Sequence, residues 1–327
     1  MTRHLPLGAG GEFDRLRAIF ATLGSAAGAL GDDSALLPVG GRTLALSIDL
    51  SLEGVHFRTD WMSLRAIGWR AAAAALSDLA AEAAQPVGVL VALGVPARRG
   101  GARARGRRRS DRGDPARELA AGVGAAVRHV GARVLGGDLV RSPLYVVDVC
   151  VLGSAERPVR RRGARPGDGL WVTGRLGGAG LALAALRRGR RPPAAAFRRF
   201  AHPEPRIAAG RWLARHGARA LIDISDGLAG DAGHLAAASA VRAEIELERI
   251  PCWAGVTPLA AVRSGEEYEL LVALPGAFGE RDARGFRRAT GLALTRIGRC
   301  VVGSGVRLTR AGRAVAPPRG FDHFPAR

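Results

Sequence analysis

Residues 43–57 read Thr-Leu-Ala-Leu-Ser-Ile-Asp-Leu-Ser-Leu-Glu-Gly-Val-His-Phe. The apolar residues of the first half predict a β-strand over residues 43–50, and Gly40-Gly41 predicts a turn from an earlier strand over 35–39. Asp49 lies at the end of the strand. An aspartate there is as often a cap as a ligand, so the stretch alone leaves its role open. It does predict a sheet whose strand ends carry carboxylates.

Four further acidic clusters occur along the chain, and most follow an apolar stretch. They are Gly31-Asp32-Asp33, Ser77-Asp78, Gly136-Gly137-Asp138 and Asp223-Ile224-Ser225-Asp226-Gly227. One Gly-Asp pair marks a turn equally well. Carboxylates brought together from separate elements repel one another unless cations lie between them. The set of five therefore predicts a site where several Mg²⁺ ions bridge carboxylates to phosphate.

The sequence lacks the common phosphate-binding motifs, which limits how a nucleotide can bind. It contains no Walker A motif and no G-x-G-x-x-G fingerprint at a strand–helix junction. All 49 basic residues are arginine, so a P-loop lysine is excluded. Gly136 and Gly137 would allow a close approach of the backbone to a phosphate. Any nucleotide is therefore expected to bind through metal carboxylates.

The order of predicted elements indicates a two-domain α/β (α+β) protein, with mixed sheets covered by helices. The 327 residues suit two domains. A segment rich in Arg, Pro and Gly at 155–168 divides them into residues 1–154 and 155–327. Strands are expected at 35–39, 43–50, 87–95, 133–135, 145–153, 169–173, 220–224, 243–247, 269–274, 293–297 and 305–308. Helices are expected at 12–23, 63–84, 115–130, 179–188, 206–216 and 231–239.

Three features favour a cytoplasmic protein that does not enter a membrane. Cys150, Cys252 and Cys300 are widely separated and odd in number, which is typical of thiols in a reducing compartment. The longest apolar runs, at 71–76 and 87–95, are too short to span a bilayer. The first residues lack the basic-then-apolar order of a secretory signal.

The net charge of +20 raises the alternative of nucleic-acid binding. The charge is concentrated at residues 97–112, which hold eight arginines and one aspartate. No aromatic residue lies between these arginines, as a stacking platform for single strands would need. We interpret the stretch 97–114 as a solvated loop, and nucleic acid is not the expected partner.

Six motifs in order resemble the thiamine-monophosphate kinase family of the aminoimidazole-ribonucleotide-synthetase-like ATP-binding superfamily. They are GDDSALL (31–37), SIDLSLEGVHF (47–57), LSDLAA (76–81), GGDLVRS (136–142), DISDGL (223–228) and GEEYEL (265–270). The resemblance extends from residue 12 to residue 324. The Val-His-Phe and C-terminal Gly-Phe-Asp-His-Phe elements favour this family over its relatives.

The resemblance implies direct transfer of the ATP γ-phosphoryl group to thiamine monophosphate, and a homodimer formed through the N-terminal sheets. It implies Mg²⁺ ligands at Asp33, Ser47, Ile48, Asp49, Asp78, Asp138, Asp223 and Asp226. Asp49, Asp138 and Asp226 are the residues expected to be catalytic. Contacts with ATP are implied for Gly137, Asp138, Arg161 and Ser225. Contacts with the thiamine substrate are implied for His56, Glu266 and Phe321.

Two departures from the family pattern bear on the site. Ile48 stands where threonine is common, so only its backbone carbonyl could bind a metal. Ser264-Gly265-Glu266-Glu267 replaces Gly-Gly-Glu-Asp, which leaves the position of Glu266 open. Two alternatives to the kinase remain: another enzyme of the superfamily, such as a purine-biosynthesis synthetase, and a catalytically degenerate basic protein that binds nucleic acid.

Overall fold

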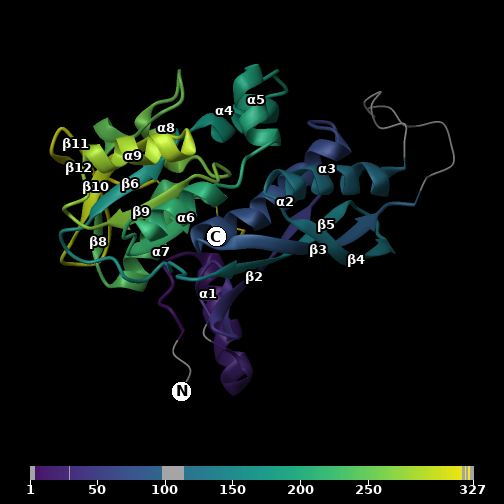
Figure 1. Ribbon diagram of the computed structural model, residues 1–327. Coiled ribbons are helices and arrows are strands. Elements are labelled where there is room, and N and C mark those ends of the chain that lie inside the picture. Colours follow the sequence, from purple (N-terminus) through teal and green to yellow (C-terminus); the bar gives the residue numbers. More distant parts are fainter. Residues whose placement is uncertain (1–3, 29, 98–113, 319–320, 322, 325–327) are drawn as a thin grey trace.

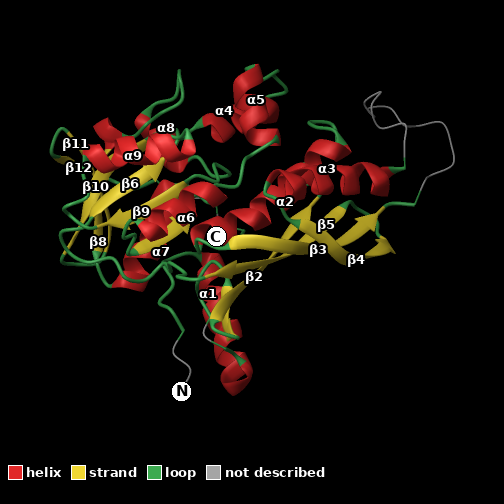
Figure 2. Cartoon of the chain, viewed as in Figure 1, coloured by secondary structure: helices red, strands yellow, loops and turns green. Residues whose placement is uncertain are grey.

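The structure is a computed structural model that describes residues 4–28, 30–97, 114–318, 321 and 323–324. Two separate β-sheets form its two halves, one of five strands and one of seven (Figures 1 and 2). Most of the arginine-rich stretch, residues 98–113, lies outside the described residues, so the prediction of a solvated loop stays a prediction. In the described part of the chain, no helix is long and apolar enough to cross a membrane.

The N-terminal half is a five-stranded sheet with helices on one face. Its strands are β1 (Ala35–Val39), β2 (Arg42–Leu52), β3 (Gln85–Val95), β4 (Arg133–Arg141) and β5 (Val146–Ala155). The order in space is β1-β2-β5-β3-β4, and only the β3–β4 pair is parallel. Helices α2 (Leu64–Ala81) and α3 (Pro115–His129) cover the inner face (Figure 1). Helix α1 (Gly11–Leu23) precedes the sheet.

Small residues bring the two covering helices together. A Cβ atom at Gly68 of α2 would clash with the backbone of Leu119, and one at Gly122 of α3 would clash with the backbone of Arg65. The alanines of α2 serve the same end, because short side chains let a helix approach its neighbours on several sides. Almost every residue of α2 is buried as a result. This helix therefore lies in the middle of the molecule.

The C-terminal half is a seven-stranded sheet with helices on both faces. Its strands are β6 (Gly169–Thr173), β7 (Ala220–Asp223), β8 (Arg242–Glu246), β9 (Leu270–Leu274), β10 (Leu294–Val301), β11 (Gly305–Arg310) and β12 (Arg313–Val315). They lie in the order β12-β11-β8-β10-β6-β9-β7. The helices are α4 (Gly178–Arg187), α5 (Ala194–Ala201), α6 (Ile207–Arg215), α7 (Leu228–Ser239), α8 (Pro258–Arg263) and α9 (Glu280–Thr290).

Helix α2 joins the two halves into one packed core. Its residues share a hydrophobic cluster with both sheets. Gly210 of α6 packs so closely that a Cβ atom there would clash with the carbonyl of Ala80. The Trp69 indole N–H donates to the carbonyl of Pro203 at 2.8 Å. The Ser77 hydroxyl donates to Asp223 at 2.7 Å, so the C-terminal half of α2 lies beside the end of β7 and brings two of the acidic motifs together.

Several predicted elements have the wrong extent or were missed. The strand expected at 133–135 continues through Gly136-Gly137-Asp138 to Arg141, because parallel pairing with β3 supplies partners for the glycine backbone. Helices α5, α8 and α9 and strand β12 were not predicted. The segment that forms α9, Glu280–Thr290, is strongly charged and buries only Ala283 and Phe286, which is too little for an apolar period to show.

Candidate active site

Three carboxylates from different parts of the chain meet at the junction of the two halves. Asp33 precedes β1, Asp78 lies on α2, and Asp223 ends β7. One carboxylate oxygen of each lies within 4.8 Å of the others. The sequence predicted all three as metal ligands, and the structure brings them together. Oxygen atoms of carboxylates at this spacing are a donor set that suits Mg²⁺.

Neighbouring hydroxyl groups orient two of these carboxylates. Ser47 of β2 donates to Asp78 Oδ2 at 2.5 Å, and Ser77 of α2 donates to Asp223 Oδ2 at 2.7 Å. Burial raises the pKa of Asp78 well above its ordinary value, and the charges of Asp223 and Asp33 raise it further. Burial raises the pKa of Asp223 to about 7, with Asp33 adding to the effect. The cluster therefore needs cations when its members are ionised.

Asp49 lies on the same side of the N-terminal sheet as this cluster. It belongs to the row of residues on β2 that faces α2, whereas its neighbour Ile48 is 68% exposed on the opposite face. Burial raises the pKa of Asp49 to about 6, and the nearby Glu266 charge raises it too. Asp49 thus interacts through its charge both with the acidic cluster and with Glu266.

Two buried acids beside the cluster were missed by the sequence reasoning. Glu82 follows α2, and its carboxylate forms a second close group with Asp32 and Asp33. Asp231 lies in the first turn of α7, where its carboxylate accepts from the backbone N–H of Gly227 at 3.1 Å. Neither acid follows a strand, so the strand-end pattern could not find them. An acid in the first helical turn after Asp-Gly was the one available signal for Asp231.

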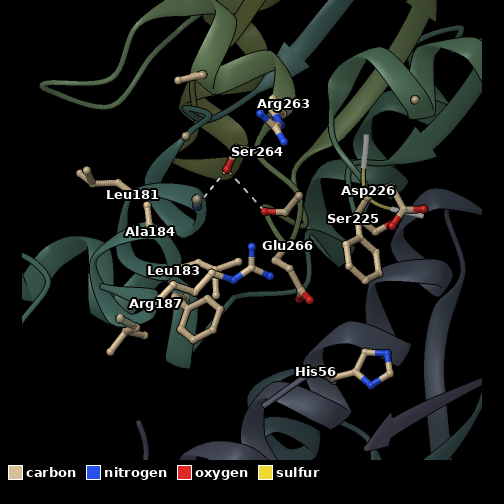
Figure 3. A pocket seen from close by; sticks show the side chains of 18 of the residues that line it. His56, Leu181, Leu183, Ala184, Arg187, Ser225, Asp226, Arg263, Ser264 and Glu266 are labelled. Atoms are coloured by element: carbon tan, nitrogen blue, oxygen red, sulfur yellow. Dashed lines mark hydrogen bonds between the residues drawn. The ribbon is translucent and has the colours of Figure 1, made fainter. Parts of the chain in front are cut away.

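A large cavity of about 2120 Å³ opens next to the acidic cluster. The loop 223–227 connects the two, because Asp223 belongs to the cluster while Ser225 and Asp226 line the cavity. Figure 3 shows Glu266 between this loop and helix α4, whose Leu181 and Ala184 form the opposite wall. The predicted substrate residues His56, Glu266 and Phe321 all line this cavity.

Glu266 is held in the cavity by backbone and side-chain contacts. It forms an ion pair with Arg70 of α2, and it accepts a hydrogen bond from the Tyr268 hydroxyl at 2.6 Å. Its φ of 62° and the φ of 48° at Tyr268 are in the left-handed region. Hydrogen bonds from these two residues to the carbonyls of Ser225 and Ile224 keep the backbone there. The replacement of Gly-Gly-Glu-Asp is thus compatible with a Glu266 that faces the cavity.

The other two glutamates of the motif support this conformation from inside the protein. Glu267 accepts hydrogen bonds from the backbone N–H groups of Gly177 and Ala179 at the start of α4, where the helix dipole favours a negative charge. Glu269 is buried and forms ion pairs with Arg199 and Arg206, at 2.8 and 2.6 Å. The motif therefore contributes one acid to the cavity and two to the core.

The remaining predicted substrate residues border the cavity from two sides. The His56 ring accepts a hydrogen bond from the Leu52 backbone at 3.1 Å, and burial lowers its pKa. Phe321 is 49% exposed, and its backbone N–H donates to the carbonyl of Asp226 at 3.0 Å. Of the C-terminal motif, Gly320 and Asp322 lie outside the described residues.

Of the other predicted site residues, Gly137 and Asp138 lie on β4 away from the cluster, whereas Arg161 contacts it. Asp138 of β4 pairs with Ala92 of β3, and β4 lies three strand spacings from β2, which corresponds to about 14 Å. A side chain at Gly137 would clash with the Val91 carbonyl, so close strand pairing explains this glycine. Arg161 is engaged in an ion pair with Asp33 at 2.6 Å. The roles of these residues toward ATP and metal stay predictions.

The raised pKa values predict that Mg²⁺ stabilises the protein more at high pH. Because the pKa of Asp223 is about 7 in the folded chain and ordinarily 3.8, the folded state binds more protons between these values. The free energy of unfolding of the metal-free protein should therefore fall as the pH rises through this window. Mg²⁺ replaces the proton, so its effect on the Tm should grow between pH of about 5 and about 8.

Calorimetry of the protein with Mg²⁺ and with a chelator at several pH values checks this prediction. Asp223→Asn is the matched control, and it should flatten the pH dependence of the metal-free Tm. An equal Mg²⁺ effect on the Tm at both ends of the pH range would contradict the prediction.

Comparison with known proteins assigns the chain to a family. The family models described as AIR synthase related protein match residues 31–155 for the N-terminal domain and 165–310 for the C-terminal domain. The thiamine-monophosphate kinase of Caulobacter vibrioides is 35% identical over 315 residues, covering 89% of this chain and 84% of the relative. That of Aquifex aeolicus is 32% identical, covering 96% and 98%. The chain belongs to the thiamine-monophosphate kinase family.

Solved structures of thiamine-monophosphate kinases are similar to this chain along their whole length. The complex of AaThiL with AMPPCP and TMP superposes with a TM-score of 0.80 at 31% identity, covering 96% of this chain and 97% of that one. The Stenotrophomonas maltophilia enzyme gives a TM-score of 0.72 at 30% identity, covering 96% and 100%. The two-domain fold expected from the sequence is therefore confirmed.

Proposed function

We propose that this protein transfers the γ-phosphoryl group of ATP to the phosphate of thiamine monophosphate, giving thiamine diphosphate and ADP. The observation that carries the proposal is the loop 223–227, which links a buried cluster of carboxylates to a cavity lined by Glu266, His56 and Phe321. The cluster suits metal-bound phosphates, and the cavity suits the organic part of the acceptor. The family assignment supports the same reaction.

The residues at the junction fit Mg²⁺. Asp33 Oδ2 is buried and has no hydrogen-bond partner among the described residues. This is the state expected of an oxygen that serves as a metal ligand. Asp33, Asp78 and Asp223 would hold the ions, with Ser47, Asp49 and Asp226 beside them. Bound Mg²⁺ supplies neutralisation of the charge on the two phosphate groups. Asp138 would bind Mg²⁺ only if an ion, alone or bound to ATP, also lies beside β4.

Phosphoryl transfer requires the correct positions of the two phosphate groups more than it requires a strong base. An oxygen of the acceptor phosphate is already anionic, so it can attack the γ-phosphorus while the bond to the β–γ bridging oxygen breaks and ADP leaves. Helix α7 begins directly after the loop 223–227, and the N–H groups of a helix start favour an anion there. The chain thereby aligns two phosphates at the end of the cavity.

The positive thiazolium of the substrate is expected to lie against Glu266. In the free protein Arg70 and the Tyr268 hydroxyl balance this carboxylate. Phe321 is placed to stack on an aromatic ring, and His56 stays neutral because burial lowers its pKa. A substrate that brings its own positive charge would compete with Arg70 for Glu266.

Glu266→Gln should therefore raise the KM for thiamine monophosphate. The expected increase is about 10- to 100-fold, since a hydrogen bond or contact to a charged group contributes about 1.5–3 kcal/mol. The KM for ATP should change little, because Glu266 lies on the cavity side. Steady-state kinetics with each substrate varied in turn measures both values. Equal changes in the two KM values would contradict a role for Glu266 toward thiamine.

An uncovered apolar surface supports the proposed homodimer. Ile48 and Leu50 of β2, Leu90 of β3, and Leu135 and Val140 of β4 are exposed on the face of the sheet opposite α2 and α3. They belong to the N-terminal sheet, whose inner face alone is covered by α2 and α3. Such a continuous apolar surface is typical of an interface, and pairing with a second copy would also protect the edge strand β4.

Leu90→Asp is expected to convert a dimer into a monomer. A carboxylate on this surface would be buried without a partner if two copies met there. Light scattering coupled to size-exclusion chromatography measures the mass. Val302→Asp is the matched control, because Val302 is 81% exposed in the other half of the chain. A dimer that survives Leu90→Asp would place the interface elsewhere.

A coupled assay for ADP release tests the proposed reaction. The purified protein with ATP and Mg²⁺ should turn over with thiamine monophosphate, and not with thiamine or with the substrate of the purine-biosynthesis synthetase. A folded protein without turnover at millimolar Mg²⁺ would overturn the proposal. Turnover with the purine precursor alone, or salt-sensitive RNA binding without turnover, would favour one of the two alternatives.

A further inference from the structure

The group formed by Asp32, Asp33 and Glu82 lies beside the proposed catalytic cluster and differs from it. One carboxylate oxygen of each lies within 4.8 Å of the others. Glu82 is fully buried, and Asp33 is 8% exposed. Only Asp33 belongs to both groups. The kinase reaction proposed above gives no role to Asp32 or Glu82.

Four oxygen atoms in this group are buried and lack a hydrogen-bond donor among the described residues. They are Asp32 Oδ2, Asp33 Oδ2, Glu82 Oε1 and Glu82 Oε2. Both oxygens of one fully buried carboxylate are thus unsatisfied. Leaving a charged group in this state costs several kcal/mol, so these carboxylates must either bind a cation or share a proton.

The nearby arginines do not provide that cation. Arg161 donates from its side chain to Asp33 Oδ1 at 2.6 Å and from its backbone to Asp32 Oδ1 at 2.9 Å. Both bonds go to the Oδ1 atoms, so the Oδ2 atoms of the two aspartates keep no donor among the described residues. Arg160 acts on Glu82 through its charge alone, and more weakly than the two aspartates do. Three carboxylates against the one guanidinium in contact leave a charge of −2.

The end of helix α2 makes the imbalance worse. Glu82 is the residue that caps the C terminus of this 18-residue helix. The C-terminal end of a helix carries a partial negative charge and favours cations. A buried carboxylate at this end is therefore unfavourable unless a positive ion lies between the helix and the two aspartates.

We propose that Asp32, Asp33 and Glu82 bind a divalent cation with a preference for oxygen ligands, separate from the ions that serve phosphoryl transfer. The donor set consists of carboxylate oxygens, and a doubly charged ion cancels the remaining charge. The spacing of up to 4.8 Å suits Mg²⁺, Mn²⁺ or Ca²⁺, whose ligands lie about 2.0–2.6 Å from the ion.

The site would act as a clamp between three segments. Asp32 and Asp33 belong to the loop before β1, and Glu82 ends α2. The segment between the two sheets passes beside them, where the Val159 N–H donates to the Glu82 carbonyl and Arg161 contacts both aspartates. A cation here fixes the loop that presents Asp33 to the catalytic cluster. The inference does not depend on which acceptor the enzyme phosphorylates.

The number of bound ions, counted without nucleotide or substrate, tests this proposal. Equilibrium dialysis against Mn²⁺ measures bound Mn²⁺ per chain for the full-length protein. Glu82→Gln should bind one ion fewer than the unchanged protein, and its Tm should rise less with Mn²⁺. Asp78→Asn should lose an ion from the group formed by Asp33, Asp78 and Asp223. The variant that carries both Glu82→Gln and Asp78→Asn should therefore show the sum of the two losses.

A shared proton is the competing explanation, and the same variants distinguish it. If Glu82 is protonated and donates to Asp32, the amide of Glu82→Gln replaces that donor, and the bound Mn²⁺ stays unchanged. That result would overturn the proposal. If Glu82→Gln does not fold, Asp32→Asn provides the same comparison, because its Oδ1 can still accept from Arg161. An unchanged count in that variant would equally overturn it.

Discussion

Asp78→Asn is expected to lower the turnover number for thiamine monophosphate by about 10³-fold. Asp78 is the central member of the cluster, since its charge is close to both Asp223 and Asp33 and its carboxylate accepts from Ser47. An amide retains the shape and loses the negative charge that holds a metal ion. Metal ions contribute several kcal/mol of charge stabilisation, and each 1.36 kcal/mol corresponds to about a tenfold change in rate.

The stability of the variant separates this loss from unfolding. In the metal-free protein Asp78 is repelled by two neighbouring carboxylates, so Asp78→Asn should leave the Tm equal or higher. The increase of the Tm with Mg²⁺ should shrink. Glu280→Gln, at an exposed position in α9, is the control and should change neither quantity. A loss of less than about threefold in turnover would reject Asp78 as a metal ligand.

Strand-end carboxylates were predictable because their position depends on local periodicity. The strand 43–50 and the helix 63–84 follow from apolar spacing, and both elements are present as β2 and α2. Asp49 and Asp78 then fall at the junction because strand ends and helix faces meet there. The apolar spacing of a segment does not show which distant segments pack against it. Glu82 lies one residue beyond α2, in a run of alanines that looks the same whether it is buried or exposed.

Gly136-Gly137-Asp138 shows that one glycine pattern can have two causes. The two glycines were expected to let the backbone approach a phosphate, and in the structure they lie inside strand β4. The close approach that requires Gly137 is to the backbone of β3. A glycine in the sequence indicates that a side chain would not fit at that position. It does not indicate whether a ligand or another part of the chain occupies the space. Whether Asp138 binds a metal is therefore a question for Asp138→Asn, compared directly with Asp78→Asn.

The Gly-Glu-Glu-Tyr-Glu motif could be recognised without knowing which glutamate acts. Three acids within four residues look equivalent in the sequence. The left-handed backbone at Glu266 and Tyr268 sends Glu266 to the cavity and the other two into the core. This distribution depends on hydrogen bonds to the loop 223–227, which is far away in the chain. The second large prediction concerns one of the buried acids.

Glu269→Ala is expected to lower the free energy of unfolding by about 3–5 kcal/mol. The Glu269 side chain is 2% exposed, and those of Arg199 and Arg206 are 7% and 11% exposed. Thr173 also donates to the carboxylate at 2.6 Å. Removing the shared acid leaves Arg199 with Glu267 at 3.8 Å and Arg206 with the half-exposed Glu204 at 3.1 Å. Breaking a buried pair in this way costs about 3–5 kcal/mol. Urea titration followed by circular dichroism measures the loss.

The same replacement at an exposed ion pair provides the matched control. Glu246 pairs with Arg249 at 2.8 Å, but both side chains are about half exposed. Water already solvates such a pair, so Glu246→Ala should cost about 0–1 kcal/mol. Glu269→Gln should fall between the two, since an amide oxygen can still accept from one arginine. If Glu269→Ala proves no more destabilising than Glu246→Ala, the arginines must find other partners, and Glu269 does not hold α5 and α6 against the sheet.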